Sequence, residues 1–416
     1  MKLKELGPGL ITGAADDDPS GIATYSQAGA QFGFNMLWTV VFTFPLMAGI
    51  QMVSARLGCM TGRGLAANIK MQYPKWLLFS IVGLLLVANT INIAADIAAM
   101  SEALRLLVGG SAHVYSLTFG LLCLVLQVFL PYKIYVQYLK WLTLGLFAYV
   151  AVVFSIQIPW LTVLERSVWP HLTWNNATIT MVVAVFGTTI SPYLFFWQAA
   201  QEVEDLRSIE KKTGNGNPVT HTSDSARAHL RRIKSDTYIG MGFSNLIAFF
   251  IILSTAATLN QAGITEIQTS AQAAQALRPL AGEFAFLLFG LGIIGTGMLA
   301  VPVLAGSAAY AVSETLGWRA GLDLKANEGR GFYGIIALAT IGGVVLDFTP
   351  TDPMKELFWS AVINGVVAVP IMAVMMLLGS KESVMGRFVI SQRLRRLGWL
   401  ATATMAVAVM AMFATI

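Results

Sequence analysis

Long apolar stretches, separated by short polar connections, dominate the hydropathy pattern of this chain. A membrane-spanning helix needs about 20 predominantly apolar residues, and eleven stretches meet this requirement. They run from Pro8 to Phe32, Met36 to Leu57, Trp76 to Leu104, His113 to Leu130, Ile134 to Ile158, Ile179 to Ala200, Tyr238 to Leu259, Phe284 to Val312, Phe332 to Phe348, Leu357 to Leu378 and Trp399 to Ile416. The pattern therefore predicts an all-α polytopic membrane protein.

Basic residues are distributed unequally between the connections. With the N-terminus in the cytoplasm, 23 of the 27 lysines and arginines lie on the cytoplasmic side. Cytoplasmic connections of membrane proteins carry an excess of such residues. The N-terminus is therefore expected in the cytoplasm and, after an odd number of spans, the C-terminus outside. The expected location is the cell membrane, which is the inner membrane of a cell that has two.

The composition excludes several other classes of protein. Only 12% of the 416 residues are charged, against about 25% in soluble domains, so a soluble enzyme is excluded. Two cysteines cannot form a disulfide framework. The basic residues lie in short connections, so we expect contact with membrane lipid and no nucleic-acid partner, and we expect a monomer.

One connection, residues 202–234, is long and polar. Its GNGNP sequence predicts a flexible cytoplasmic loop. We interpret its basic clusters as topology signals that contact anionic lipid.

The first apolar stretch is interrupted near its middle by the sequence DDDPSG, residues 16–21. A charged side chain inside a membrane costs several kcal/mol, so three adjacent aspartates are not explained by packing against lipid. Pro19 removes a backbone hydrogen bond and Gly21 relaxes the chain. The sequence predicts an unwound segment with free carbonyls beside a carboxylate, which is a cation site lining a hydrated cavity.

The sixth stretch is interrupted in the same way by GTTISP, residues 187–192. Two broken helices five spans apart, which enter the membrane from opposite sides, predict an inverted repeat. The repeats would be residues 1–160 and residues 161–378, the second including the connection 202–234, and residues 379–416 would add a basic loop and the eleventh span.

These interruptions carry a resemblance to a known family. GPGLITGAADDDPSGIATY resembles the first helix of the Nramp divalent-metal transporters, whose motif there is Asp-Pro-Gly-Asn. FGTTISPY is similar to the sixth-helix motif of that family, Ala-Thr-Ile-Met-Pro-His. The resemblance extends over the first ten spans. It implies a LeuT-like fold of five-plus-five inverted repeats, with helices 1 and 6 discontinuous, that moves divalent cations by alternating access.

The resemblance also implies which residues hold the metal. The aspartate of the family motif falls on Asp18, its asparagine on Gly21, its carbonyl-donating alanine on Thr188 and its methionine on Ser191. The histidine after the proline falls on Tyr193. No cofactor is expected besides the transported ion.

Two of these positions depart from the family motif in ways that favour a hard cation. Ser191 replaces a soft thioether with an oxygen, and Gly21 replaces an amide and is expected to leave extra room. Mg²⁺ binds one or two carboxylates and keeps several waters. We therefore expect Mg²⁺ to be the preferred imported ion and Mn²⁺ the second. The pattern also resembles the divergent Nramp-related magnesium transporters.

The three aspartates cannot share one role, because successive residues of a helix are rotated by about 100°. We expect Asp18 to contact the ion and Asp17 to act through water or through the vestibule potential. Asp16 either lies in the cytoplasmic vestibule without a direct role or contributes to the site.

The third span carries Asn89, Asn92 and Asp96 on one helical face. This stripe is a wall of the permeation route or a hydrogen-bonded seam between helices. Asn364 in the tenth span has the same two interpretations.

Proton coupling is expected to be weak or absent. The family has an acidic residue three positions after the one matching Asp96, where this chain has Ala99, and Tyr193 replaces the histidine. A membrane potential of 100 mV supplies about 2.3 kcal/mol per elementary charge, or about 4.6 kcal/mol for a divalent cation. This energy could drive Mg²⁺ entry without protons.

Two other transport functions remain as alternatives. One is a proton-coupled Mn²⁺/Fe²⁺ symporter of the Nramp type. The other is a LeuT-fold transporter of amino acids or other organic solutes, although three acids would repel a substrate carboxylate. A membrane enzyme lacks support, since the sequence holds no zinc motif, nucleotide-binding loop or nucleophile elbow.

Overall fold

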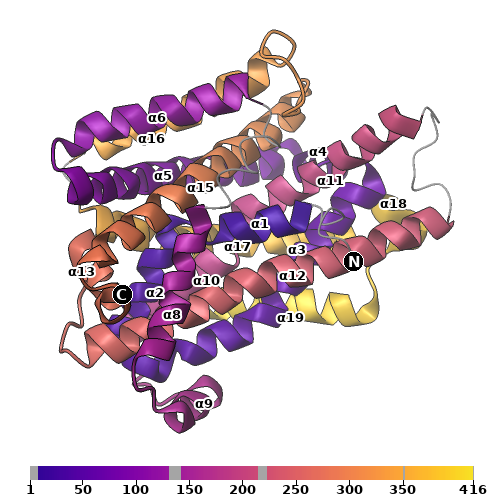
Figure 1. The fold of residues 1–416 in the computed structure, drawn as a ribbon. Helices are drawn as coiled ribbons and strands as arrows, with labels where there is room; N and C mark the ends of the chain where they lie inside the picture. The colour runs from indigo at the N-terminus through magenta and orange to yellow at the C-terminus, as the bar shows by residue number, and fades with distance from the viewer. Residues whose placement is uncertain (1–7, 131–141, 214–222, 350–351, 416) are drawn as a thin grey trace.

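The structure, a computed structural model, describes residues 8–130, 142–213, 223–349 and 352–415, and every regular element in these ranges is helical (Figure 1). The helices of the N-terminal part are α1 (Pro8–Asp16), α2 (Pro19–Phe32), α3 (Leu37–Thr61), α4 (Leu65–Gln72), α5 (Lys75–Val108), α6 (Ala112–Phe129) and α8 (Phe147–Ser155). Those that follow are α9 (Trp160–Val168), α10 (Asn176–Thr189), α11 (Pro192–Thr213), α12 (Ser223–Thr255), α13 (Ser270–Ala274), α14 (Arg278–Ala281), α15 (Ala285–Leu316), α16 (Arg330–Asp347), α17 (Pro353–Gly379), α18 (Glu382–Met385) and α19 (Gln392–Thr415).

The helices reproduce the predicted spans. Within the described ranges, nine helical segments are long and apolar enough to cross a membrane. The first, Pro19–Thr61, contains the second part of the first predicted span and the whole of the second span. A short 3₁₀ turn at Gly33–Met36 separates α2 from α3 within it. The fifth predicted span appears as the shorter apolar helix Leu144–Ser155. Its first part, residues 134–141, lies outside the described residues.

Both predicted helix interruptions are confirmed. The first span is divided between α1 and α2, with Asp17 and Asp18 in the connection. The sixth is divided between α10 and α11, with Ile190 and Ser191 in the connection.

The expected long loop at residues 202–234 is wrong for most of its length. Helix α11 continues to Thr213 and α12 begins at Ser223, so both helices extend well beyond their apolar parts. Arg232 on α12 makes ion pairs with Glu202 and Asp205 on α11, at N–O distances of 2.5 and 2.7 Å. These pairs join the two helices and explain why a polar sequence is helical here. The GNGNP sequence falls in residues 214–222, outside the described ranges.

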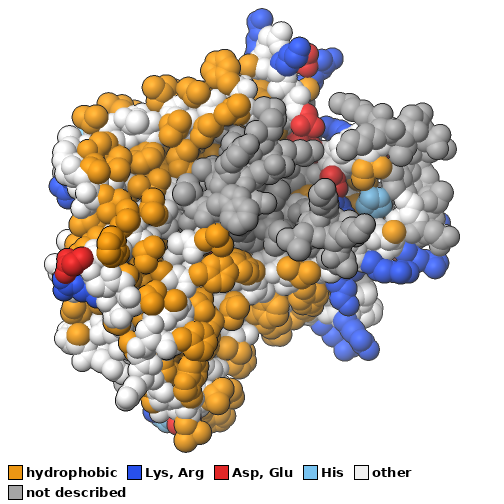
Figure 2. Space-filling model, viewed as in Figure 1, with side chains coloured by type: hydrophobic (Ala, Val, Ile, Leu, Met, Phe, Trp, Pro, Cys, Tyr) orange, Lys and Arg blue, Asp and Glu red, His pale blue; other side chains and the backbone are white. Residues whose placement is uncertain are grey.

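The long helices form one bundle, with α4 and α18 near one end and α9 and α13 near the other (Figure 1). Apolar side chains cover much of the face shown in Figure 2, and lysines and arginines gather mainly toward the end that carries α4 and α18. This surface suits a bundle embedded in lipid and flanked by water. The chain is an integral membrane protein.

Glycines allow the broken helices to approach their neighbours closely. A Cβ atom added at Gly187 on α10 would lie 2.1 Å from the carbonyl oxygen of Ala361 and 2.4 Å from the amide nitrogen of Gly365, both on α17. A Cβ atom at Gly13 on α1 would lie 2.3 Å from the carbonyl oxygen of Gly240 on α12. Each crossing therefore excludes any side chain at its glycine.

The crossing at Gly187 can be tested with a single methyl group. Gly187→Ala should lower the stability of the protein by about 1–3 kcal/mol, because backbone atoms of α17 occupy the position of the methyl. The measurement is thermal unfolding of the purified protein in detergent.

The matched control is Gly334→Ala on α16, where an added Cβ atom meets nothing within 4 Å. That variant should unfold at the wild-type temperature or above it. Equal melting temperatures for the two variants would contradict the close crossing.

Candidate metal-binding site

Asp18 begins the second half of the first broken helix. Its Oδ1 atom accepts a hydrogen bond from the backbone N–H of Gly21 at 2.7 Å, so Asp18 is the N-cap of α2. Pro19 follows as the first helical residue, which suits its fixed φ and its missing N–H. The Asp18 side chain is only 2% exposed. The sequence Asp-Pro therefore starts a helix and, at the same point, places a carboxylate inside the bundle.

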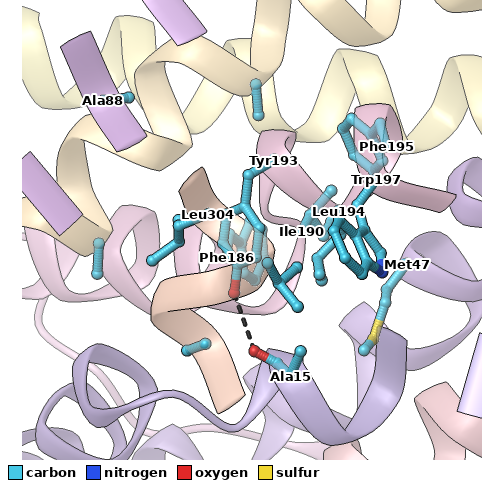
Figure 3. Close-up of a cluster of buried hydrophobic side chains, with 14 of the residues drawn as sticks. Ala15, Met47, Ala88, Phe186, Ile190, Tyr193, Leu194, Phe195, Trp197 and Leu304 are labelled. Carbon is cyan, nitrogen blue, oxygen red and sulfur yellow. Dashed lines mark hydrogen bonds between the residues drawn. The ribbon is translucent and has the colours of Figure 1, made fainter. Parts of the chain in front are cut away.

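Tyr193, in the first turn of α11, joins the two breaks. Its hydroxyl lies 3.0 Å from the carbonyl oxygen of Ala15 and 3.3 Å from Oδ2 of Asp18. Figure 3 draws the first of these hydrogen bonds, between α11 and the end of α1. One hydroxyl proton can serve only one of these acceptors at a time. The Asp18 side chain thus faces the sixth-span break.

Ser191 lies in the connection between α10 and α11. Its hydroxyl donates to the carbonyl oxygens of Thr188 at 2.7 Å and Gly187 at 3.2 Å. These carbonyls belong to the last turn of α10, where helix geometry leaves oxygens without an intrahelical partner. The predicted carbonyl donor, Thr188, is therefore at a helix end, and the hydroxyl of Ser191 contacts it.

The expectation of extra room at Gly21 is wrong for this arrangement. A Cβ atom there would lie 3.1 Å from Oγ1 of Thr188 and 3.4 Å from both Oδ1 of Asp18 and Cε2 of Tyr25. The hydroxyl of Thr188 and the ring of Tyr25 occupy the neighbourhood that the missing side chain would fill. Gly21 allows α2 to approach α10, and the two breaks meet at this contact.

Asp16 and Asp17 face α12 instead. The hydroxyl of Ser244 lies 2.8 Å from Oδ2 of Asp16 and 3.0 Å from Oδ1 of Asp17. Successive turns of α12 present Asp236, Gly240 and Ser244 to α1, and Asp236 accepts the N–H of Gly9 at 2.8 Å. This stripe, spaced by four residues, holds α1 along its length.

Two groups near the site were missed by sequence reasoning. Ser244 lies in an apolar span far from Asp16 in the chain, and only its polarity within that span could have drawn attention to it. The hydroxyl of Tyr25 lies 3.0 Å from Oγ1 of Thr189. This second contact between α2 and α10 follows from the tertiary fold and has no local sequence signal.

The remaining predicted residues are buried around this centre. Asp96 on α5 interacts electrostatically with Asp18, and the backbone N–H of Ser20 lies near both carboxylates. Asn92 lies one turn before Asp96 on the same helix. Asn364 on α17 is also buried and precedes Gly365 of the helix crossing. The structure thus brings Asp18, Gly21, Thr188 and Tyr193 together and places the other polar residues around them.

The chemistry of this centre is that of oxygen donors. Carboxylate, hydroxyl and carbonyl oxygens converge where two helices are interrupted inside an apolar bundle. Hard divalent cations take ligands of this kind, and discontinuous helices are the form in which membrane transporters expose backbone oxygens to ions. The centre is therefore suited to a cation that passes through the bundle as substrate.

The fold is that of the LeuT-like membrane transporters. The chain matches a manganese transporter of Eremococcus coleocola, solved in complex with an aromatic bis-isothiourea substituted compound, with a TM-score of 0.76 over 98% of this chain and 86% of that one, at 16% identity. It also matches MhsT, solved with L-phenylalanine, with a TM-score of 0.62 over 98% of both chains, at 10% identity.

The family follows from the sequence itself. The model of the family described as natural resistance-associated macrophage protein-like, Nramp, matches residues 9–415. The chain belongs to the Nramp family. A similar curated relative, the divalent metal cation transporter MntH of Aeromonas hydrophila, is 28% identical over 318 residues, which are 73% of this chain and 71% of the relative. MntH of Yersinia pestis is 29% identical over 317 residues, with the same coverage.

Proposed function

We propose that this protein imports divalent metal cations by alternating access, and that the ion binds between the two helix breaks. The residues that hold it are Asp18, the backbone of Gly21, the carbonyl of Thr188 and the hydroxyl of Ser191. Asp17, Tyr193 and Asn364 lie around this set and act on the potential and the opening of the site. The protein is a transporter without a bound cofactor and acts as a monomer in the cell membrane.

The observation that carries this proposal is the environment of Asp18. Its carboxylate is buried beside two interrupted helices and accepts hydrogen bonds from Gly21 and Tyr193. A buried carboxylate is costly unless it is paired, and a transported cation supplies that pairing. Membership of the Nramp family and the names of the MntH relatives favour a divalent metal as the ion.

The substitution at Ser191 supports Mg²⁺ as the preferred ion, with Mn²⁺ second. Ser191 presents a hydroxyl where the family motif has a thioether, and hydroxyl oxygen suits hard cations. Because Thr188 and Tyr25 pack close to Gly21, a hydrated ion would enter only after the two breaks separate. Binding of a hydrated ion would therefore require the helices to move apart, as alternating access requires.

We further propose that import needs little or no proton coupling. The acidic position of the family is Ala99 here, and the histidine position is Tyr193. The membrane potential supplies about 4.6 kcal/mol for a divalent ion at 100 mV.

The excess of basic residues on one side of the membrane supports a cytoplasmic N-terminus and an external C-terminus.

Removing the Asp18 carboxylate tests the site. In proteoliposomes, Asp18→Ala should lower uptake of Mg²⁺ and Mn²⁺ by more than about 100-fold, because even supporting partners of a metal ligand are worth 10–100-fold in affinity. Retained uptake would refute the assignment of Asp18.

Two readouts from the same vesicles address the alternatives. Labelled amino acids should not enter vesicles that hold the wild-type protein, whereas their uptake would favour an organic-solute transporter. A trapped pH-indicator dye should report little acidification during metal entry. Acidification matched to metal entry would overturn the uncoupled mechanism and favour the proton-coupled symporter.

Ser191→Met tests the basis of ion selection. A thioether at this position should raise the uptake of Mn²⁺ relative to Mg²⁺, by about tenfold if the preference changes by about 1.4 kcal/mol. Competition between the two ions for uptake measures the ratio, and Ser191→Ala serves as the control that removes the hydroxyl without adding sulfur. An unchanged ratio in the methionine variant would show that Ser191 does not select the ion.

A further inference from the structure

The polar stripe of α5 divides into two parts with different surroundings. Nδ2 of Asn89 donates to the carbonyl oxygen of Leu304 at 2.8 Å and to Oγ of Ser307 at 2.7 Å, both on α15. Asn89 therefore belongs to a seam between helices. The next two members of the stripe, Asn92 and Asp96, do not continue this seam.

Asn92 and Asp96 are fully buried, each with 0% of its surface exposed. Within the part of the chain that the structure describes, neither amide atom of Asn92 has a hydrogen-bond partner, and the one donor near the Asp96 carboxylate is the backbone N–H of Ser20, which it shares with Asp18. A buried polar atom without a partner costs about 1–3 kcal/mol, and more when it is charged. Such groups need a partner, which a bound ion or a water can supply.

The charged groups around Asp96 indicate whether a ligand bound there carries a positive or a negative charge. The neighbouring charge that acts on Asp96 is the carboxylate of Asp18, which repels it, and among the described residues no lysine or arginine contributes. The N–H of Ser20 lies nearby and is shared with Asp18. A cation relieves the repulsion between the two carboxylates, and an anion or a neutral solute does not.

A pocket lies where α2 ends and α17 begins, on the side that is external in the proposed orientation. Its volume is about 380 Å³, and its lining includes Gln27, Glu266, Asp352 and Lys355. A small cavity shares Ala23 and Met354 with it and reaches Ala99. Ala99 is one helical turn from Asp96 on α5.

We propose that Asn92 and Asp96 form a second divalent-cation station beside the Asp18 site, through which the transported ion passes. A carboxylate and an amide oxygen are ligands that Mg²⁺ and Mn²⁺ accept. One ion uses the two stations in sequence, since two dications at short range in an apolar bundle repel strongly. This inference rests on the proposed function and adds a place where the ion is held.

Binding of Mn²⁺ to purified full-length protein tests the station, with free Mn²⁺ counted by electron paramagnetic resonance. Asp18→Asn should keep Mn²⁺ binding that is weaker than wild type by about 100-fold or more, because Asp18 is itself a ligand. Adding Asp96→Asn should abolish this remaining binding. Adding Thr90→Val instead should leave it unchanged, because Thr90 bonds within its own helix, to the carbonyl oxygen of Leu86.

Asn92→Asp tests the station through a gain of Mn²⁺ affinity, so this test does not rely on a loss of binding that misfolding could also cause. In the Asp18→Asn background it should tighten Mn²⁺ binding by about tenfold, because a carboxylate replaces an amide. The station would be contradicted if Asp18→Asn bound no Mn²⁺. It would also be contradicted if neither Asp96→Asn nor Asn92→Asp changed the residual Mn²⁺ binding of Asp18→Asn.

These outcomes separate the station from the proposed function. If Asp18→Asn abolishes uptake but its residual Mn²⁺ binding is unchanged by Asp96→Asn, the transport site at Asp18 is supported and the second station is contradicted. If Asp18→Asn transports at the wild-type rate, the proposed function falls. A change in vesicle acidification by Asp96→Asn with unchanged Mn²⁺ binding would show that Asp96 carries protons only, which also overturns the station.

Discussion

The interaction on which this structure depends is the cap that Asp18 makes on α2. One side chain both starts a helix, by accepting the N–H of Gly21, and carries the charge at the centre of the bundle. An ion that binds Asp18 therefore competes with, or adds to, the hydrogen bonds that define the helix break. Occupation of the site and the geometry of α1 and α2 are thus physically linked, and alternating access requires such a link.

The surrounding helices hold the two halves of the break differently. Helix α1 is held along α12 by Gly9, Gly13 and the Asp16–Asp17 pair, and by Tyr193 at its end. Helix α2 contacts α17, where Ser360 bonds to Ser20, and α10, where Tyr25 contacts Thr189. It also packs closely on α12, because a Cβ atom at Gly29 would lie 2.4 Å from the carbonyl oxygen of Ile252. Both halves thus share α12, whereas α11 contacts α1, and α10 and α17 contact α2. Motion of α1 and α11 relative to α2, α10 and α17 would open the centre on one side and close it on the other.

The main architecture could be predicted from the sequence because its causes are local. A proline alone does not break a helix here, since Pro45, Pro302 and Pro370 lie inside α3, α15 and α17. The breaks near Pro19 and Pro192 are visible in the sequence because polar residues and a glycine cluster around each of these prolines. The polar helices around residues 202–234 were missed because ion pairs of Arg232 with distant residues stabilise them. The room at Gly21 was misjudged because Thr188 fills it from another helix. The hydroxyl of Ser244 between two aspartates was likewise a tertiary contact without a local signal.

The central claim is that an ion sits between the two breaks, against Asp18. The direct measurement is the anomalous scattering of crystals of the wild-type protein soaked in Mn²⁺. The account predicts a peak at or within one water layer of the Asp18 carboxylate, on the side that faces Thr188 and Ser191. A well-ordered site elsewhere in the bundle, with nothing beside Asp18, would contradict it.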